Sequence, residues 1–180
     1  MKGLTLIELM AAVAILTIIL SVAVPGTSYL LEKYQADIAI TALKSTLQRA
    51  RSLAFKNELP ITACPTHNSQ CFNSWENDIT VFHDANFNQR VDTNEHTFFS
   101  TKLNISTGYI QKKKADNPFI LFNPMGHAFG SSTTFLYCPY SKNNSIARQL
   151  VISFQGRIRI GKYTTKNGTP YSSVAPLSCR

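Results

Sequence analysis

The chain has 180 residues, of which 44% are hydrophobic and 16% charged, and its formal net charge is +8. An apolar N-terminal segment takes up 28 residues and leaves about 150, enough for one domain with its own core. This length implies no second domain, and the absence of internal repeats and low-complexity segments excludes a repeat architecture.

The first 25 residues are the most distinctive part of the chain. The leader Met1-Lys2-Gly3 is followed by an apolar run from Leu4 to Val24. At about 1.5 Å per residue this run spans roughly 30 Å as a helix, which matches a bilayer core, so we predict that it crosses a membrane. A carboxylate inside a bilayer costs about 2.5 to 3.5 kcal/mol, so Glu8 needs a partner. No basic residue lies between Gly3 and Lys33, and we therefore expect that partner outside the segment.

The sequence Gly3-Leu4-Thr5-Leu6-Ile7-Glu8-Leu9 resembles the type IV prepilin signal. The resemblance implies that prepilin peptidase cuts after Gly3 and methylates the amine of Leu4, and that Glu8 pairs with the terminal amine of a neighbouring subunit. Pro25 falls where many pilins have a helix kink. An ordinary signal peptide or anchor explains the apolar run but not Glu8, and the small-residue cleavage site of a secretory signal is missing.

After Pro25 the helix is predicted to continue to between Asn57 and Pro60, because proline disfavours the helical state of the residue before it. Apolar residues at alternating steps of four and three predict a stripe that packs on a sheet. They are Ala36, Ile40, Leu43, Leu47, Ala50 and Ala54.

From residue 61 the pattern changes to short β-prone runs separated by Asn, Gly, Pro and Ser, which predicts a mostly antiparallel head. The runs are Ile61 to Cys64, Ile79 to Phe82, Thr97 to Ser100, Phe119 to Phe122, Thr133 to Tyr137, Leu150 to Phe154 and Arg157 to Ile160. We expect residues 164–176 to form a loose tail.

Four cysteines follow a segment that carries the chain across an inner membrane, so disulfides are permitted. Of three possible connectivities, we favour Cys64 with Cys71, which closes a short loop, and Cys138 with Cys179, which secures the end of the chain. A zinc site at Cys64, His67 and Cys71 is the alternative, but three ligands at this spacing match no common site.

Further stretches along the chain resemble the FimT/GspH group of minor type IV pilins and type II secretion pseudopilins. They are Leu43 to Ala54 with the strand Ile61 to Cys64, Trp75, Val81 to Asn86, Glu95, Phe122 to Gly126, and Val151 to Arg157. The resemblance implies an α+β fold in which a long N-terminal helix packs on a head of antiparallel sheets.

The domains expected from this resemblance are a leader (1–3), a transmembrane and filament-core half-helix (4–28), and a head made of an amphipathic half-helix (29–57) and a β domain (60–180). The expected location is the inner membrane as a single-pass protein with a periplasmic head, and then the pilus or cell surface. Other pilins or pseudopilins are the expected partners. No cofactor is implied, and no histidine pairs with a nucleophile, so we expect a non-enzyme.

Positive charge is concentrated in the second half of the chain. Residues 1–99 carry seven Lys and Arg against nine Asp and Glu, whereas residues 100–180 carry eleven against one. A single-sign field of this size favours a polyanion, and the candidates are DNA, lipopolysaccharide phosphates and anionic lipid. Plain solubility is the alternative, but it does not explain why the charge lies in one half.

One basic element has a geometry suited to phosphates. Residues 150–162 read as a hairpin whose two-residue turn is Gln155-Gly156. Strand alternation then turns Ile158 and Ile160 inward, while Arg157 and Arg159 share the outer face about 6.6 Å apart. Lys162 extends the row.

In FimT-like pilins a Gly-Arg-x-Arg element is associated with DNA binding during natural transformation, and Gly156, Arg157 and Arg159 match it. We therefore expect the hairpin to bind double-stranded DNA with little sequence specificity. The alternative is that edge charges only discourage aggregation, in a structural subunit that initiates or caps a filament.

Other basic residues are possible extensions of this footprint. Lys112, Lys113 and Lys114 form a run that reads equally well as a solvated loop, and Arg148 is a further candidate.

An acidic segment has the spacing of a calcium-binding loop. Its first, third, fifth, ninth and twelfth positions are Asp84, Asn86, Asn88, Asp92 and Glu95. However, Gln89 stands at the sixth position, where the sharp turn prefers glycine, and the flanks read as strands. A polar connection between strands is therefore the favoured interpretation, with calcium as the alternative.

Overall fold

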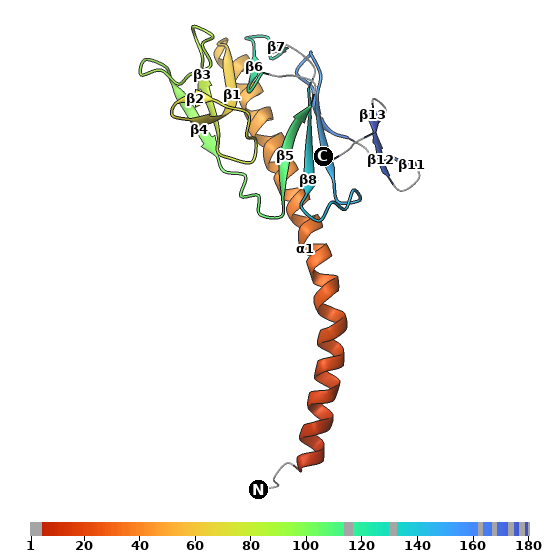
Figure 1. Ribbon diagram of the computed structural model, residues 1–180. Coiled ribbons are helices and arrows are strands. Elements are labelled where there is room, and N and C mark those ends of the chain that lie inside the picture. The colour runs from red at the N-terminus through yellow and green to blue at the C-terminus, as the bar shows by residue number, and fades with distance from the viewer. Residues whose placement is uncertain are drawn as a thin grey trace. The chain divides into compact units, whose positions relative to one another are not determined.

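The computed structural model of the protein describes residues 5–113, 117–129, 133–161, 164–166, 169–172, 175–176 and 179. For residues 22–26 and those after 163, except Cys179, it describes the backbone alone. Figure 1 shows one long helix, α1 (Leu6–Asn57), leading into a β-rich head. The strands are β1 (Ile61–His67), β2 (Gln70–Cys71), β3 (Ile79–His83), β4 (Thr97–Thr101), β5 (Gly108–Lys113), β6 (Ile120–Phe122), β7 (Ala128–Phe129), β8 (Thr133–Pro139), β9 (Arg148–Ile152), β10 (Ile158–Ile160), β11 (Thr164–Lys166), β12 (Thr169–Ser172) and β13 (Ala175–Pro176).

The chain divides into two compact units, residues 1–34 and 35–180. In the first unit the described apolar side chains from Leu6 to Leu20 lie on the surface, and Leu6 and Ile7 are 77% and 75% exposed. No helix of the described residues combines the length and apolarity that a membrane crossing requires.

In the second unit the predicted stripe of α1 is confirmed as core. Its six residues are at most 1% exposed, and they share one cluster with inward side chains of two sheets. The largest buried side chain, Trp75, packs edge-to-face on Phe135 with ring centroids 4.5 Å apart. The helix ends at Asn57, inside the predicted window before Pro60.

All strand pairs are antiparallel, as predicted for the head. The first sheet has the order β4-β3-β1-β6-β7, with β2 paired to β1, and the second sheet has the order β10-β9-β8-β5. β11, β12 and β13 form a small third sheet.

The seven predicted strands are all present, with ends that differ by a few residues. The prediction missed the two-residue strands β2 and β7, and it also missed β5. The sequence of β5, Gly-Tyr-Ile-Gln-Lys-Lys, has one aliphatic residue and two lysines, so its inward-outward alternation is not visible as a hydrophobic pattern. The expectation of a loose tail over residues 164–176 was wrong, because this segment contains the strands of the third sheet.

Both favoured disulfides are confirmed. Cys64 bonds to Cys71 across the β1–β2 hairpin, and Cys138 of β8 bonds to Cys179. The first disulfide occupies both sulfur atoms of the alternative zinc site, so no thiolate is available there. The second lies in a cluster with Leu136, Ala147 and Tyr109 on the outer face of the second sheet.

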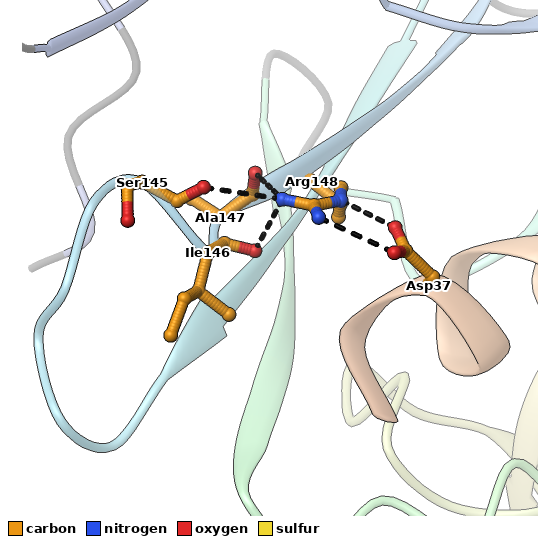
Figure 2. A network of polar contacts seen from close by, with 5 residues as sticks. All are labelled: Asp37, Ser145, Ile146, Ala147 and Arg148. Carbon is orange, nitrogen blue, oxygen red and sulfur yellow. Dashed lines mark hydrogen bonds and ion pairs between the residues drawn. The ribbon is translucent and has the colours of Figure 1, made fainter. Parts of the chain in front are cut away.

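Arg148 joins α1 to the second sheet, as Figure 2 shows. Its Nε donates to Asp37 Oδ1, and its Nη2 lies 3.3 Å from Asp37 Oδ2. Its Nη1 donates to the carbonyl oxygens of Ser145, Ile146 and Ala147 at 3.3, 2.9 and 3.2 Å. The Arg148 side chain is only 11% exposed, whereas that of Asp37 is 53% exposed.

This asymmetry predicts unequal costs for removing the two partners. Replacement of Arg148 by Met leaves three carbonyl groups without their donor and is expected to lower the free energy of unfolding by about 2 to 4 kcal/mol. Replacement of Asp37 by Asn loses a half-exposed ion pair, and the expected cost is about 0.5 to 1 kcal/mol. Urea unfolding of the detergent-solubilised, disulfide-intact chain measures both, and equal losses would contradict this assignment.

Candidate nucleic-acid interface

The second sheet presents a basic row on its outer face. Successive side chains of a strand point to opposite faces, and directly paired residues share a face. Ile158 is buried against the core, so Arg159 points outward, and it is exposed. Arg159 pairs with Val151, Val151 with Thr134, and Thr134 with Lys113, which places Arg159 and Lys113 at opposite ends of one outward row.

Arg157 lies just before β10 and is also exposed. The N–H of Ser153 donates to the Arg157 carbonyl at 3.0 Å, which extends the β9–β10 pairing by one position. Arg157 and Arg159 are two residues apart, so extended backbone turns both outward, as predicted. Ile160 pairs with the buried Leu150 and so lies on the inward face, as predicted. It is nevertheless 39% exposed, because β10 is an edge strand.

The turn that carries Arg157 is longer than the predicted two residues. Residues 153–156 form a β-turn closed by Gly156 N–H to Ser153 carbonyl at 2.8 Å. Gly156 has φ +75°, and a Cβ there would lie 2.0 Å from the Gly126 carbonyl oxygen. Glycine is therefore required at this position for both conformation and space.

Arg51, which the sequence prediction missed as a functional residue, holds this turn to α1. Its Nε donates to the Gly126 carbonyl at 2.8 Å, and its Nη2 donates to the Gln155 carbonyl at 3.2 Å. The N–H of Ala128 donates to the Phe154 carbonyl at 3.0 Å and joins the same two turns. One guanidinium thus bridges two turns that lie far apart in the sequence.

The prediction that Lys112 contacts DNA was wrong. It pairs with Phe135, whose side chain is in the core, so it points inward. Its Nζ donates to the Asn117 carbonyl, Asn117 Oδ1 and the Phe119 carbonyl at 2.6, 2.8 and 2.9 Å. It also lies 5.8 Å from the Trp75 ring centroid. Burial lowers the pKa of the Lys112 ammonium to about 8.

Arg148 was likewise wrong as a phosphate contact, because its guanidinium is committed to Asp37 and to three carbonyl groups. Lys113 shares the row of Arg159. Lys114 and Lys162 lie outside the described residues.

At the N-terminus Glu8 has a partner within its own helix. Its Oε2 accepts hydrogen bonds from the Thr5 N–H and the Thr5 hydroxyl, both at 2.9 Å, and the Glu8 N–H lies 3.4 Å from Thr5 Oγ1. This reciprocal arrangement is a capping box, which satisfies backbone donors at a helix start. The expected cleavage site, Gly3 and Leu4, lies outside the described residues, and α1 continues through Pro25.

The acidic segment lies between β3 and β4, so the strands predicted on its two flanks are present. Hydrogen bonds connect Asn86, Asn88, Asp92 and Glu95 directly to one another. Asp84 does not bond to these four, and its Oδ2 instead accepts from Thr62 and from the Gln89 N–H.

Comparison with known proteins identifies the family. Residues 39–156, more than half of the chain, match the family described as Type II transport protein GspH, and residues 1–24 match the prokaryotic N-terminal methylation motif. No curated protein sequence matches the chain.

Solved structures share the fold. Two crystal forms of the type IV minor pilin FimU from Pseudomonas aeruginosa align with TM-scores of 0.56 and 0.51 at 21% and 23% identity. They cover 74% and 69% of this chain and 92% and 90% of theirs. The minor pseudopilin EpsH from the Type 2 Secretion System of Vibrio cholerae aligns with a TM-score of 0.49 at 12% identity, covering 70% of this chain and 95% of its own. The family match over the head, the methylation motif and the α+β fold agree, and the chain belongs to the GspH family.

Proposed function

We propose that this protein is a minor type IV pilin that binds double-stranded DNA without sequence preference and supports DNA uptake in natural transformation. The observation that carries the proposal is the outward row of the second sheet, in which Arg159 and Lys113 stand at the two ends and Arg157 lies beside Arg159. In this proposal the apolar N-terminal helix anchors the protein in the inner membrane, and prepilin peptidase processes it before it joins other pilins.

The spacing of the row suits a duplex. β10 and β5 are three strand positions apart, which at about 4.8 Å each separates Arg159 from Lys113 by about 14 Å. The major groove is roughly 12 Å wide, so these two cations can meet phosphates on both of its sides. Arg157 and Arg159 are closer together and can engage neighbouring phosphates of one strand through planar, bidentate guanidinium groups.

The contacts in this proposal are to the backbone of DNA rather than to bases. The arginines lie on or beside edge strand β10 and not on a helix that could enter the major groove. Affinity therefore comes from neutralisation of phosphates and depends strongly on salt concentration. Arg51 contributes by holding the turn of residues 153–156 in place and is a positioning residue.

A second candidate function is assembly of a pilus or secretion pseudopilus without DNA binding. It is favoured by the exposed apolar side chains of the first unit, which need cover from lipid or from other subunits. The two functions are compatible, because they use different parts of the chain.

The DNA proposal predicts a specific change in salt dependence. In the double variant Arg157→Gln, Arg159→Gln, the dependence of the logarithm of the binding constant on the logarithm of salt concentration should become shallower by about two units, one per lost phosphate contact. Affinity should fall alike for unrelated duplexes. Fluorescence anisotropy with full-length protein in detergent measures both, and transformation should fall while piliation stays.

The matched control is the double variant Arg90→Gln, Lys102→Gln, which removes the same charge from exposed positions outside the second sheet. It should bind DNA nearly as wild type. If the Arg157, Arg159 variant folds and retains the wild-type affinity and salt dependence, the assembly function becomes the better proposal.

A different signature is expected for Arg51. In Arg51→Met the two carbonyl contacts are lost, so the turn shifts and the free energy of unfolding falls by about 1 to 3 kcal/mol. DNA affinity should weaken while the salt dependence stays unchanged, because no phosphate contact is removed. Anisotropy titrations over a range of salt concentrations measure this, and a slope reduced as in Arg157→Gln would show that Arg51 itself touches DNA.

The capping box allows a sharper test of Glu8 than removal of its side chain. In Glu8→Gln the amide oxygen still accepts from Thr5, so the helix start is kept while the charge that would pair with a neighbour's amine is lost. We expect both Glu8→Gln and Glu8→Ala to reach the membrane normally and to be depleted from sheared filaments. Immunoblots of membrane and sheared fractions decide this, and normal incorporation of Glu8→Gln would assign Glu8 to capping alone.

A further inference from the structure

Backbone hydrogen bonds fix the loop between β3 and β4 to the rest of the head. The His83 N–H donates to the His96 carbonyl at 2.9 Å and closes its base. The Cys71 N–H donates to the Gln89 carbonyl at 3.0 Å, and the Val91 N–H donates to the Ser69 carbonyl at 2.7 Å. These bonds tie the loop to the disulfide-bonded β1–β2 hairpin, so its backbone is fixed on two sides.

Asp84, at the start of this loop, is a buried carboxylate with one unpartnered oxygen. The residue is 1% exposed. Its Oδ2 accepts from the Thr62 hydroxyl at 3.1 Å and from the Gln89 N–H at 3.3 Å. The bond to Gln89 places the carboxylate inside the loop. Its Oδ1 is buried and has no hydrogen-bond partner among the described residues. A buried carboxylate oxygen without a donor is costly, and a bound cation would remove that cost.

The backbone of the loop satisfies the requirement that argued against calcium in the sequence. Gln89, at the sixth position, has φ +62°, the left-handed conformation for which glycine is preferred there. The Asn88 N–H donates to Asn86 Oδ1 at 3.1 Å, and the Arg90 N–H donates to Asn88 Oδ1 at 2.9 Å. These bonds orient the amide oxygens of the third and fifth positions.

The remaining acidic groups complete an oxygen-rich set. Asp92 Oδ2 accepts from Asn86 Nδ2 at 3.0 Å and from Asn88 Nδ2 at 2.8 Å, and these amides hold the pKa of the Asp92 carboxyl below its usual value. Glu95 Oε1 accepts from the Ala85 N–H at 2.9 Å, and its Oε2 accepts from the Asp92 N–H at 3.3 Å. With Arg90, the loop carries a net charge of −2 in a protein of net charge +8.

We propose that the β3–β4 loop binds one calcium ion through Asp84, Asn86, Asn88, the Arg90 carbonyl, Asp92 and Glu95. Within the described part of the chain, no three His, Cys, Asp or Glu side chains converge on one point as a ready metal cluster. The proposed site instead mixes carboxylates with amide and backbone oxygens, and binding exchanges the amide contacts of Asp92 for contacts to the cation. Oxygen ligands in this number favour calcium over zinc, and their flexible spacing favours it over magnesium.

The test uses full-length protein in non-ionic detergent, with disulfides intact and metal removed by chelation. Titration with calcium chloride in a calorimeter should give one site with a dissociation constant of about 10⁻⁴ to 10⁻³ M, the range of extracellular modules. Calcium should also raise the melting temperature, and magnesium chloride should do neither. Absence of both effects in folded protein would overturn the proposal, and so would an equal response to magnesium.

Variants distinguish a built site from diffuse charge. Glu95→Gln removes a half-buried ligand charge and should weaken calcium binding by more than about tenfold. Asp92→Asn, which keeps an oxygen acceptor for the Asn amides, should do the same and serves if Glu95→Gln does not fold. Asp78→Asn removes an exposed charge outside the loop and should leave calcium affinity unchanged. Wild-type affinity in both loop variants, or equal weakening in Asp78→Asn, would show that the loop is not a calcium site.

Discussion

Burial of the apolar stripe along the second half of α1 determines which face of each sheet lies in the core. The stripe combines the small side chains of Ala36, Ala50 and Ala54 with the larger ones of Leu43 and Leu47, and all of them belong to the buried core. Inward side chains of the first and second sheets belong to the same cluster as this stripe, so one face of each sheet is buried in the core. Since side chains alternate along a strand, the outward face is determined at the same time. The exposure of Arg159 is thus a consequence of the burial of Ile158.

Local pattern was sufficient to predict most of the fold. The stripe on α1, the end of the helix and seven strands depend on spacing within a few residues, and all of them are present. The disulfides also followed from the sequence, because four exported cysteines allow few pairings. The sequence alone did not show which residues of β5 face the core. The pairing of Lys112 with Phe135 shows that Lys112 points inward and that its neighbour Lys113 points outward.

The roles of other residues depended on contacts between distant parts of the chain. Arg148 looked like a surface cation because its acidic partner Asp37 lies 111 residues away. Arg51 looked like an ordinary polar position of a helix, and its bonds to the carbonyls of Gly126 and Gln155 are again long-range. The left-handed backbone of Gln89 is a further example, since glycine is the residue that sequence patterns associate with it.

The uneven distribution of charge along the chain becomes a difference between the two sheets. The acidic loop belongs to the first sheet, whose strands β1 to β4 come from residues 61–101, whereas the second sheet comes entirely from residues 108–160. Opposite tendencies of charge on two sheets of one core reduce self-repulsion within the head. They also give the head two surfaces of different charge.

The disulfide between Cys138 and Cys179 has a mechanical consequence. β10 is an edge strand held on one side by β9 alone, so a load applied to it could peel it away one hydrogen-bonded pair at a time. The covalent bond, however, joins β8 to a residue 41 positions later, and it thereby encloses β9 and β10 in a ring. Tension on the Arg157 to Arg159 segment reaches β8 through the chain on both sides, and the length that can unravel is limited to this ring. The disulfide therefore reinforces the head around this edge strand.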